Sequence, residues 1–116
     1  MKLAIVGSRT LVINNLENYL PENITEIVSG GAKGIDTCAA NYALEHHIPY
    51  KEFLPDYKKY GRAAPVVRNR LISEYADIAL VFWNGRSKGT KNVINLFHDL
   101  GKEIIIIEQN ETDTLA

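Results

Sequence analysis

The chain contains very little of several features that define other classes of protein. It has a single cysteine, Cys38, and therefore cannot form an internal disulfide. It shows no apolar run of about 18 residues and no signal peptide. None of its three histidines has a cysteine or carboxylate at ligand spacing, so no metal site is predicted. We therefore expect a cytoplasmic protein without membrane contact or resident cofactor.

A strong charge of one sign is also missing. Thirteen Lys and Arg residues against fourteen Asp and Glu residues leave a formal charge of -1. No global positive field then attracts nucleic acid or an anionic membrane, and any anion site must be local. Hydrophobic residues make up 46% of the 116 residues, which is ordinary for a globular domain with one core.

Short apolar runs alternate with helical patterns along the chain. The runs predict five strands, at residues 3–6, 24–28, 50–54, 78–82 and 104–107. Apolar spacing predicts four helices, near residues 16–20, from 34 to about 47, from 65 to about 75, and from about 90 to 100. Residues 57–61 are expected to form a polar loop. The pattern predicts one α/β domain over residues 1–107, with a mainly parallel sheet, helices on both faces and a polar tail at 108–116.

Unusual residues follow four of the predicted strands. In open α/β sheets, ligands bind outside the carboxyl ends of the strands. The segments at these ends are Gly7-Ser8-Arg9, Ser29 to Gly34, Pro55-Asp56, and Trp83 to Thr90. We expect them to converge on one crevice.

The segment Ser29-Gly30-Gly31-Ala32-Lys33-Gly34 joins a predicted strand to a predicted helix. Its glycines and the free N–H groups of the helix start predict a phosphate cradle, although a tight turn would also use glycine. It is neither a Walker A loop nor a complete dinucleotide fingerprint. Asp36 follows in the first helical turn, where it either binds ribose hydroxyls or only stabilises the helix dipole.

The segment from Trp83 to Thr90 predicts a second anion cradle, because it also joins a strand to a helix. Its candidate ligand residues are Trp83, Gly85, Ser87, Gly89 and Thr90. An N-cap role explains Thr90 equally well.

Arg68 is the predicted anion ligand of the third helix. Helical geometry places it on the face of Leu71 and Ile72, which should cover the sheet, and places Arg70 about 200° away. Its guanidinium would grip a phosphate, with a salt bridge to a neighbouring element as the alternative.

Other candidates carry weaker signals. Asp56 is either a ribose ligand or a turn residue, and Tyr57, Tyr60 and Trp83 either stack on a base or pack as apolar side chains. Asp36 and Asp56 are the two candidate catalytic acids, and no catalytic triad is present.

Taken together, these segments, with Tyr60-Gly61-Arg62-Ala63-Ala64 and Arg68-Asn69-Arg70, resemble the SLOG superfamily. The resemblance spans roughly residues 2–107 and is closest to the small stand-alone YspA-like members. It is also similar to the DprA/Smf proteins and the Lonely Guy phosphoribohydrolases. It implies a Rossmann-like nucleotide-binding fold that is usually oligomeric, so a homo-oligomer is expected. It also adds Asn69 to the expected ligand residues.

The departures from those branches order the possible functions. Val93 stands where Lonely Guy enzymes carry their catalytic glutamate, and Asn84 stands where many relatives have aspartate. The first hypothesis is therefore binding of a phosphorylated nucleoside or nucleotide-derived small molecule, with Arg9 and Arg68 neutralising charge. The second is hydrolysis of a nucleotide N-glycosidic or phosphoribosyl bond. Single-stranded DNA binding ranks third, because the overall charge is balanced.

Overall fold

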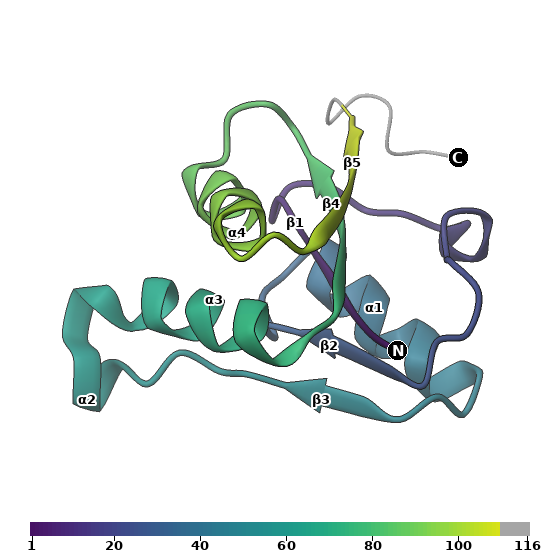
Figure 1. Cartoon of the computed structure of the whole chain (residues 1–116), viewed down its shortest axis with the longest axis horizontal. Coiled ribbons are helices and arrows are strands. Elements are labelled where there is room, and N and C mark those ends of the chain that lie inside the picture. The colour runs from purple at the N-terminus through teal and green to yellow at the C-terminus, as the bar shows by residue number, and fades with distance from the viewer. Residues whose placement is uncertain (110–116) are drawn as a thin grey trace.

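A computed structural model describes residues 1–109 and contains a five-stranded parallel sheet (Figure 1). The strands are β1 (Lys2–Gly7), β2 (Glu26–Ser29), β3 (Tyr50–Glu52), β4 (Ile78–Trp83) and β5 (Glu103–Glu108). They lie in the order β3-β2-β1-β4-β5, and every neighbouring pair is parallel. The predicted α/β class with a parallel sheet is confirmed.

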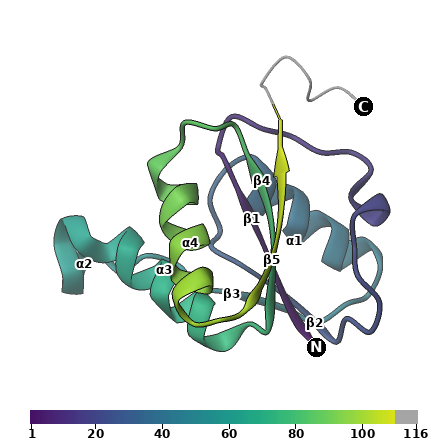
Figure 2. The ribbon, with the colours of Figure 1, turned by 45° about the horizontal axis from the view of Figure 1, so that its top comes forward.

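Helices cover both faces of this sheet. They are α1 (Ile35–Glu45), α2 (Tyr57–Tyr60), α3 (Ala64–Tyr75) and α4 (Lys88–Asp99), with 3-10 turns η1 (Leu16–Asn18) and η2 (Gly61–Ala63). Figures 1 and 2 show α1 on one face and α3 with α4 on the other. No helix in the described part of the chain is long and apolar enough to cross a membrane.

The central strand β1 supplies both layers of the core. Leu3 and Ile5 pack in the cluster with α1, whereas Ala4 and Val6 pack in the cluster with α3 and α4. Successive side chains of a strand point to opposite faces, so a strand covered on both sides is apolar throughout. This is the physical basis of the apolar runs in the sequence.

The prediction of a helix near residues 16–20 is wrong, because only the 3-10 turn η1 forms there. Asn14 and Asn15 precede this turn and Asn18 ends it, and asparagine favours turns over helix interiors. The connection from β1 to β2 is instead a loop whose Leu11 and Leu16 pack onto the α1 side of the core.

Three smaller predictions also need correction. Residues 57–60 form the short helix α2 rather than a loop, because the Asp56 carboxylate caps it by accepting from Lys59 N at 3.2 Å. Leu71 does not face the sheet: it is 44% exposed, while its neighbour Ile72 is fully buried. Strand β5 is one residue longer at each end than the predicted strand at 104–107, and residues 110–116 of the predicted tail lie outside the described residues.

The strand order places a topological switch between β1 and β4. From β1 the chain builds outward to β2 and β3, then returns to the other side of β1 with β4 and β5. Connections leave these two adjacent strands in opposite directions, which opens a crevice at their carboxyl ends. The residues that follow β1 and β4 therefore lie on either side of that crevice.

Candidate functional site

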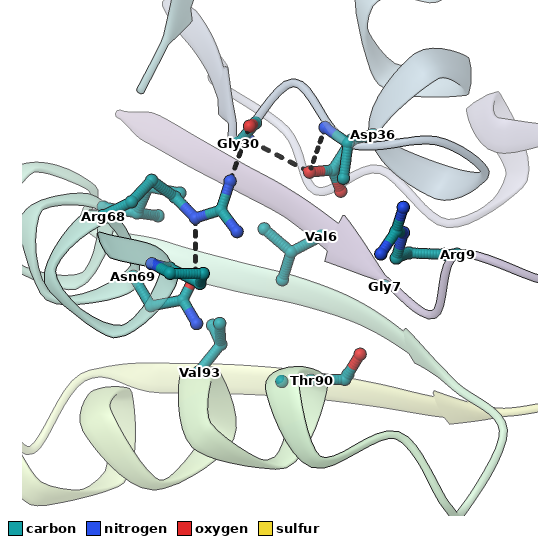
Figure 3. Close-up of a pocket in the computed structure, with 13 residues that line it drawn as sticks. Val6, Gly7, Arg9, Gly30, Asp36, Arg68, Asn69, Thr90 and Val93 are labelled. Atoms are coloured by element: carbon teal, nitrogen blue, oxygen red, sulfur yellow. Dashed lines mark hydrogen bonds between the residues drawn. The ribbon is translucent and has the colours of Figure 1, made fainter. Parts of the chain in front are cut away.

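A cavity of about 100 Å³ lies at this switch point, between the ends of β1 and β2 and the helices α3 and α4 (Figure 3). We call it the inner cavity. It is lined by Val6, Gly7, Arg9, Gly30, Ala32, Asp36, Pro65, Arg68, Asn69, Ile72, Gly89, Thr90 and Val93. It adjoins an outer cavity of about 310 Å³ that shares six of these residues and adds Gly31, Pro55 and Tyr57.

The structure brings together ten of the seventeen predicted ligand residues. The ten that line the inner or outer cavity are Gly7, Arg9, Gly30, Gly31, Ala32, Asp36, Arg68, Asn69, Gly89 and Thr90. The seven that line neither are Ser8, Ser29, Lys33, Gly34, Trp83, Gly85 and Ser87. In the view of Figure 3, Arg9 and Arg68 approach the inner cavity from opposite sides, and Thr90 lies across it from Asp36.

The buried carboxyl group of Asp36 accepts hydrogen bonds from the backbone of the first glycine loop, Ser29 to Gly34. It is only 5% exposed, and its Oδ2 accepts hydrogen bonds from Gly30 N at 3.1 Å and Ala32 N at 3.2 Å. Burial raises the pKa of this carboxyl, opposed by the Ala32 hydrogen bond, the charge of Arg68 and the hydrogen bonds of Gly30 and Gly7. Two N–H groups of the predicted phosphate cradle therefore already have a carboxylate partner.

Gly30 also provides the room that Arg68 needs. Arg68 Nη1 donates to the Gly30 carbonyl oxygen at 2.6 Å, and a Cβ atom on residue 30 would stand 2.5 Å from the same nitrogen. Burial lowers the pKa of Arg68, and the nearby charges of Asp36 and Tyr57 oppose this shift. The guanidinium remains protonated, since an arginine pKa starts so far above neutrality. The loop after β2 and helix α3 thus meet through one charged hydrogen bond.

Asn69 extends this contact to α4. Arg68 Nε donates to Asn69 Oδ1 at 2.8 Å, and Asn69 Nδ2 donates to Asn92 Oδ1 at 2.9 Å. These two bonds use both the oxygen and the nitrogen of the Asn69 side-chain amide, which is buried. Its observed role is to orient Arg68 and join α3 to α4.

The N-terminus of α4 presents oriented donors to the inner cavity. Ser87 is its N-cap and accepts from Thr90 N at 3.3 Å, so the N-cap role proposed for Thr90 belongs to Ser87. Asn84 Oδ1 holds the preceding turn by accepting from the N–H groups of Arg86 and Ser87. The N–H of Gly89 has no acceptor within the helix because it lies in the first turn, and Gly89 borders both cavities.

Several predicted residues that line neither cavity instead hold the loops around it. Ser8 Oγ accepts from Asn84 N at 3.1 Å, which ties the loop after β1 to the loop after β4. Trp83 Nε1 donates to Ser87 O at 3.1 Å. The Ser29 hydroxyl bonds the Tyr50 hydroxyl on β3 at 2.5 Å.

Gly34 also belongs to this group. It has φ of 74°, and a Cβ there would stand 2.6 Å from the carbonyl oxygen of Arg9. Glycine is thus needed for the backbone itself. Lys33 is exposed, and Gly85 lies in the turn before α4.

Four lining residues were missed by the sequence analysis: Val6, Pro65, Ile72 and Val93. A usable signal existed for two of them. Val93 lies four residues after Gly89, and Ile72 lies four residues after Arg68, so each shares a helix face with a predicted ligand residue.

Asp56, the other candidate catalytic acid, lines neither cavity and is exposed at the start of α2. In residues 1–109, no three His, Cys, Asp or Glu side chains gather to hold a metal ion.

The model of the YspA, cpYpsA-related SLOG family matches residues 3–60, half of the chain. The chain belongs to this SLOG family. No curated protein and no solved structure shows a significant match. Membership in the SLOG family confirms the resemblance seen in the sequence and points to a nucleotide-related binding or modifying role.

The matched segment of this SLOG protein contains only part of the site. It includes Arg9, Gly30 and Asp36, whereas Arg68 and Gly89 lie beyond residue 60. The fold brings both groups to one cavity at the switch point.

Proposed function

We propose that this SLOG protein binds a phosphorylated nucleoside, or a related nucleotide-derived small molecule, in the inner and outer cavities. The observation that supports this most directly is the convergence of Arg9, Arg68 and the N-terminus of α4 on one small cavity. A helix N-terminus favours anions, and guanidinium groups form strong charge-assisted bonds with phosphate. Asp36 offsets one of the two positive charges, which suits a ligand of low negative charge.

The phosphate belongs beside Gly89 rather than on the first glycine loop. The Gly30 and Ala32 N–H groups already donate to Asp36, and an anion placed there would face a carboxylate. Beside Gly89, the anion meets a free N–H group and the positive end of the helix dipole. Asp36 then lies on the opposite side, where its carboxylate suits ribose hydroxyl groups.

The two cavities also fit the expected ligand in size. The inner cavity of about 100 Å³ is suited to a phosphate group. The outer cavity of about 310 Å³ has room for the base and part of the ribose, and its volume is at the low end of typical ligand pockets, about 300 to 1,000 Å³.

Thermal unfolding with AMP, ADP and ADP-ribose tests this function, with adenosine as the control that lacks phosphate. A ligand present at 100 times its dissociation constant adds about 2.7 kcal/mol to the free energy of unfolding. We expect at least one phosphorylated compound to raise the melting temperature and adenosine to leave it nearly unchanged. No shift with any nucleotide would contradict the proposal.

Hydrolysis of a nucleotide N-glycosidic or phosphoribosyl bond is a second candidate, because of Asp36. This carboxyl lines the inner cavity, and burial raises its pKa, which favours a proton donor to a departing base. The position of Asp56 as the cap of α2 makes it the weaker choice. If the activity exists, AMP should yield free adenine by chromatography, and Asp36→Asn should abolish the release. Intact AMP after prolonged incubation would argue against catalysis.

A further inference from the structure

The three aromatic residues proposed to stack on a base lie in different places. Trp83 donates to Ser87 O and borders a separate surface depression next to α4. Tyr60, at the end of α2, is not among the residues that line either cavity. Tyr57, at the start of α2, lines the outer cavity. The structure therefore separates one candidate from the other two.

Tyr57 is held at the rim by the short helix that it begins. The Asp56 carboxylate accepts from Lys59 N at 3.2 Å and fixes this turn. Pro55 precedes it and also lines the outer cavity. Tyr57 is 61% exposed, and it lines the outer cavity together with Arg68. Tyr57 therefore shares a cavity with the predicted phosphate ligand Arg68, and much of its surface is open.

The other residues that line the outer cavity have few side-chain groups that could form hydrogen bonds with the polar edge of a base. Among the described residues that line it, besides Tyr57 and the two arginines, are only Gly30, Gly31, Ala32, Pro55, Pro65 and Gly89. None of these carries a side-chain carboxylate or amide. A base in this cavity is therefore bound mainly through its flat face, and aromatic side chains provide such stacking for every base.

We propose that Tyr57 is the base-stacking residue of this site, and that the site ranks nucleotides by stacking surface, purines above pyrimidines. The inference rests on the proposed nucleotide binding and identifies the part of the ligand that the outer cavity takes. The phosphate contacts Gly89, Arg9 and Arg68, and the base lies against the Tyr57 ring. Base identity is read weakly because the stacking face is common to all bases.

Isothermal titration calorimetry with AMP, UMP and ribose 5-phosphate tests the role of Tyr57. Ribose 5-phosphate keeps the phosphate and sugar but lacks the base. Tyr57→Ala should weaken AMP binding about ten- to a hundredfold, as expected for loss of one stacked base, and leave ribose 5-phosphate binding unchanged. Tyr57→Phe keeps the ring and should retain AMP affinity. Tyr60→Ala, in the same helix, is the matched control and should bind AMP like the wild type.

The preference for AMP over UMP is a second readout. It should be present in the wild type and shrink in Tyr57→Ala, because the variant has lost the surface that distinguishes the two bases. Unchanged AMP affinity in Tyr57→Ala, with binding by the wild type intact, would overturn the stacking role and leave the proposed function standing. Equal losses for AMP and ribose 5-phosphate would also overturn it. A wild type that binds neither compound would contradict both the stacking role and the proposed function.

Discussion

The Arg68 guanidinium occupies the space that a side chain on residue 30 would need. Its Nη1 donates to the Gly30 carbonyl oxygen at 2.6 Å, and a Cβ on residue 30 would stand 2.5 Å from the same atom. A charged side chain from α3 is thereby fixed against the loop after β2. Arg68 consequently has two roles, one in the stability of the loop and one in the proposed phosphate site.

Replacing Arg68 should reduce stability even without ligand. Arg68→Ala leaves the Gly30 carbonyl without its donor and Asp36 without its nearby positive charge, at a cost of about 1 to 3 kcal/mol. The sequence left two roles open for Arg68, a phosphate contact or a salt bridge to a neighbouring element, and the structure shows a hydrogen bond to the Gly30 carbonyl oxygen instead of that salt bridge. Urea unfolding measures the change, and Arg70→Ala is the control because Arg70 is exposed on the same helix. Equal stability of the two variants would contradict the structural role.

Two glycine substitutions should have opposite effects. Gly30→Ala forces the Arg68 guanidinium to move and should cost about 1 to 3 kcal/mol of unfolding free energy. Gly89→Ala places its Cβ in open space within a helix, where alanine is preferred by about 0.5 to 1 kcal/mol. The ligand-free melting temperature should therefore fall in the first variant and stay or rise in the second. A destabilised Gly89→Ala variant would contradict a helical Gly89 with open space around an added Cβ.

Gly89→Ala should nevertheless weaken nucleotide binding, since the added methyl group stands at the border of both cavities. Calorimetric titration of AMP measures this loss. The same variant with raised stability and unchanged AMP affinity would place the ligand elsewhere.

Asp36 allows a test of the buried carboxylate. Its Oδ2 accepts from both Gly30 N and Ala32 N, and an asparagine oxygen can keep both bonds without a charge. Asp36→Asn should therefore preserve or raise stability at neutral pH. Asp36→Ala should cost about 1 to 3 kcal/mol because the two N–H groups lose their acceptor. Urea unfolding of both variants measures how much of the stability depends on the hydrogen-bond acceptor and how much on the charge of Asp36.

The contribution of Asp36 to the free energy of unfolding should change with pH in one direction. Burial raises the pKa of folded Asp36 above its ordinary value of 3.8, so the folded state favours the protonated carboxyl. Its contribution to stability is complete below pH 3.8 and is lost as the pH rises through the raised pKa. Relative to Asp36→Asn, the wild type should therefore become less stable with increasing pH across this window. A difference that changes in the opposite direction would indicate a lowered pKa.

The sheet was predictable mainly because its central strands β1 and β4 are buried on both faces and are therefore short apolar runs. The same reasoning failed at residues 16–20, where the apolar positions of Leu16 and Leu20 have helical spacing but only a 3-10 turn forms. Leu16 and Leu20 pack against the same core cluster from an irregular loop, and their spacing therefore imitates a weak helical stripe. Apolar spacing reports which residues are buried more reliably than it reports the backbone that buries them.

The site was predictable where its residues follow strand ends, as with Arg9 and Gly89. The partner of Arg68 was not predictable, because Arg68 donates to a carbonyl oxygen 38 residues away in the chain. Asn92 shows the same limit, since its bond to Asn69 joins two helices. Local spacing contains no information on such long-range contacts. The bonds that occupy N–H groups of the first glycine loop are in contrast local, since Asp36 accepts from Gly30 N and Ala32 N.

The most direct test of the central claim is calorimetric titration of AMP into the wild type, Arg9→Ala and Arg70→Ala. Arg9 is exposed and lines both cavities, whereas Arg70 is exposed and lines neither. If the phosphate lies between Arg9, Arg68 and the N-terminus of α4, Arg9→Ala should weaken AMP binding about ten- to a hundredfold through loss of a charge-assisted contact. Arg70→Ala should match the wild type. Equal affinities for all three proteins, or equal losses in both variants, would contradict the proposed phosphate site.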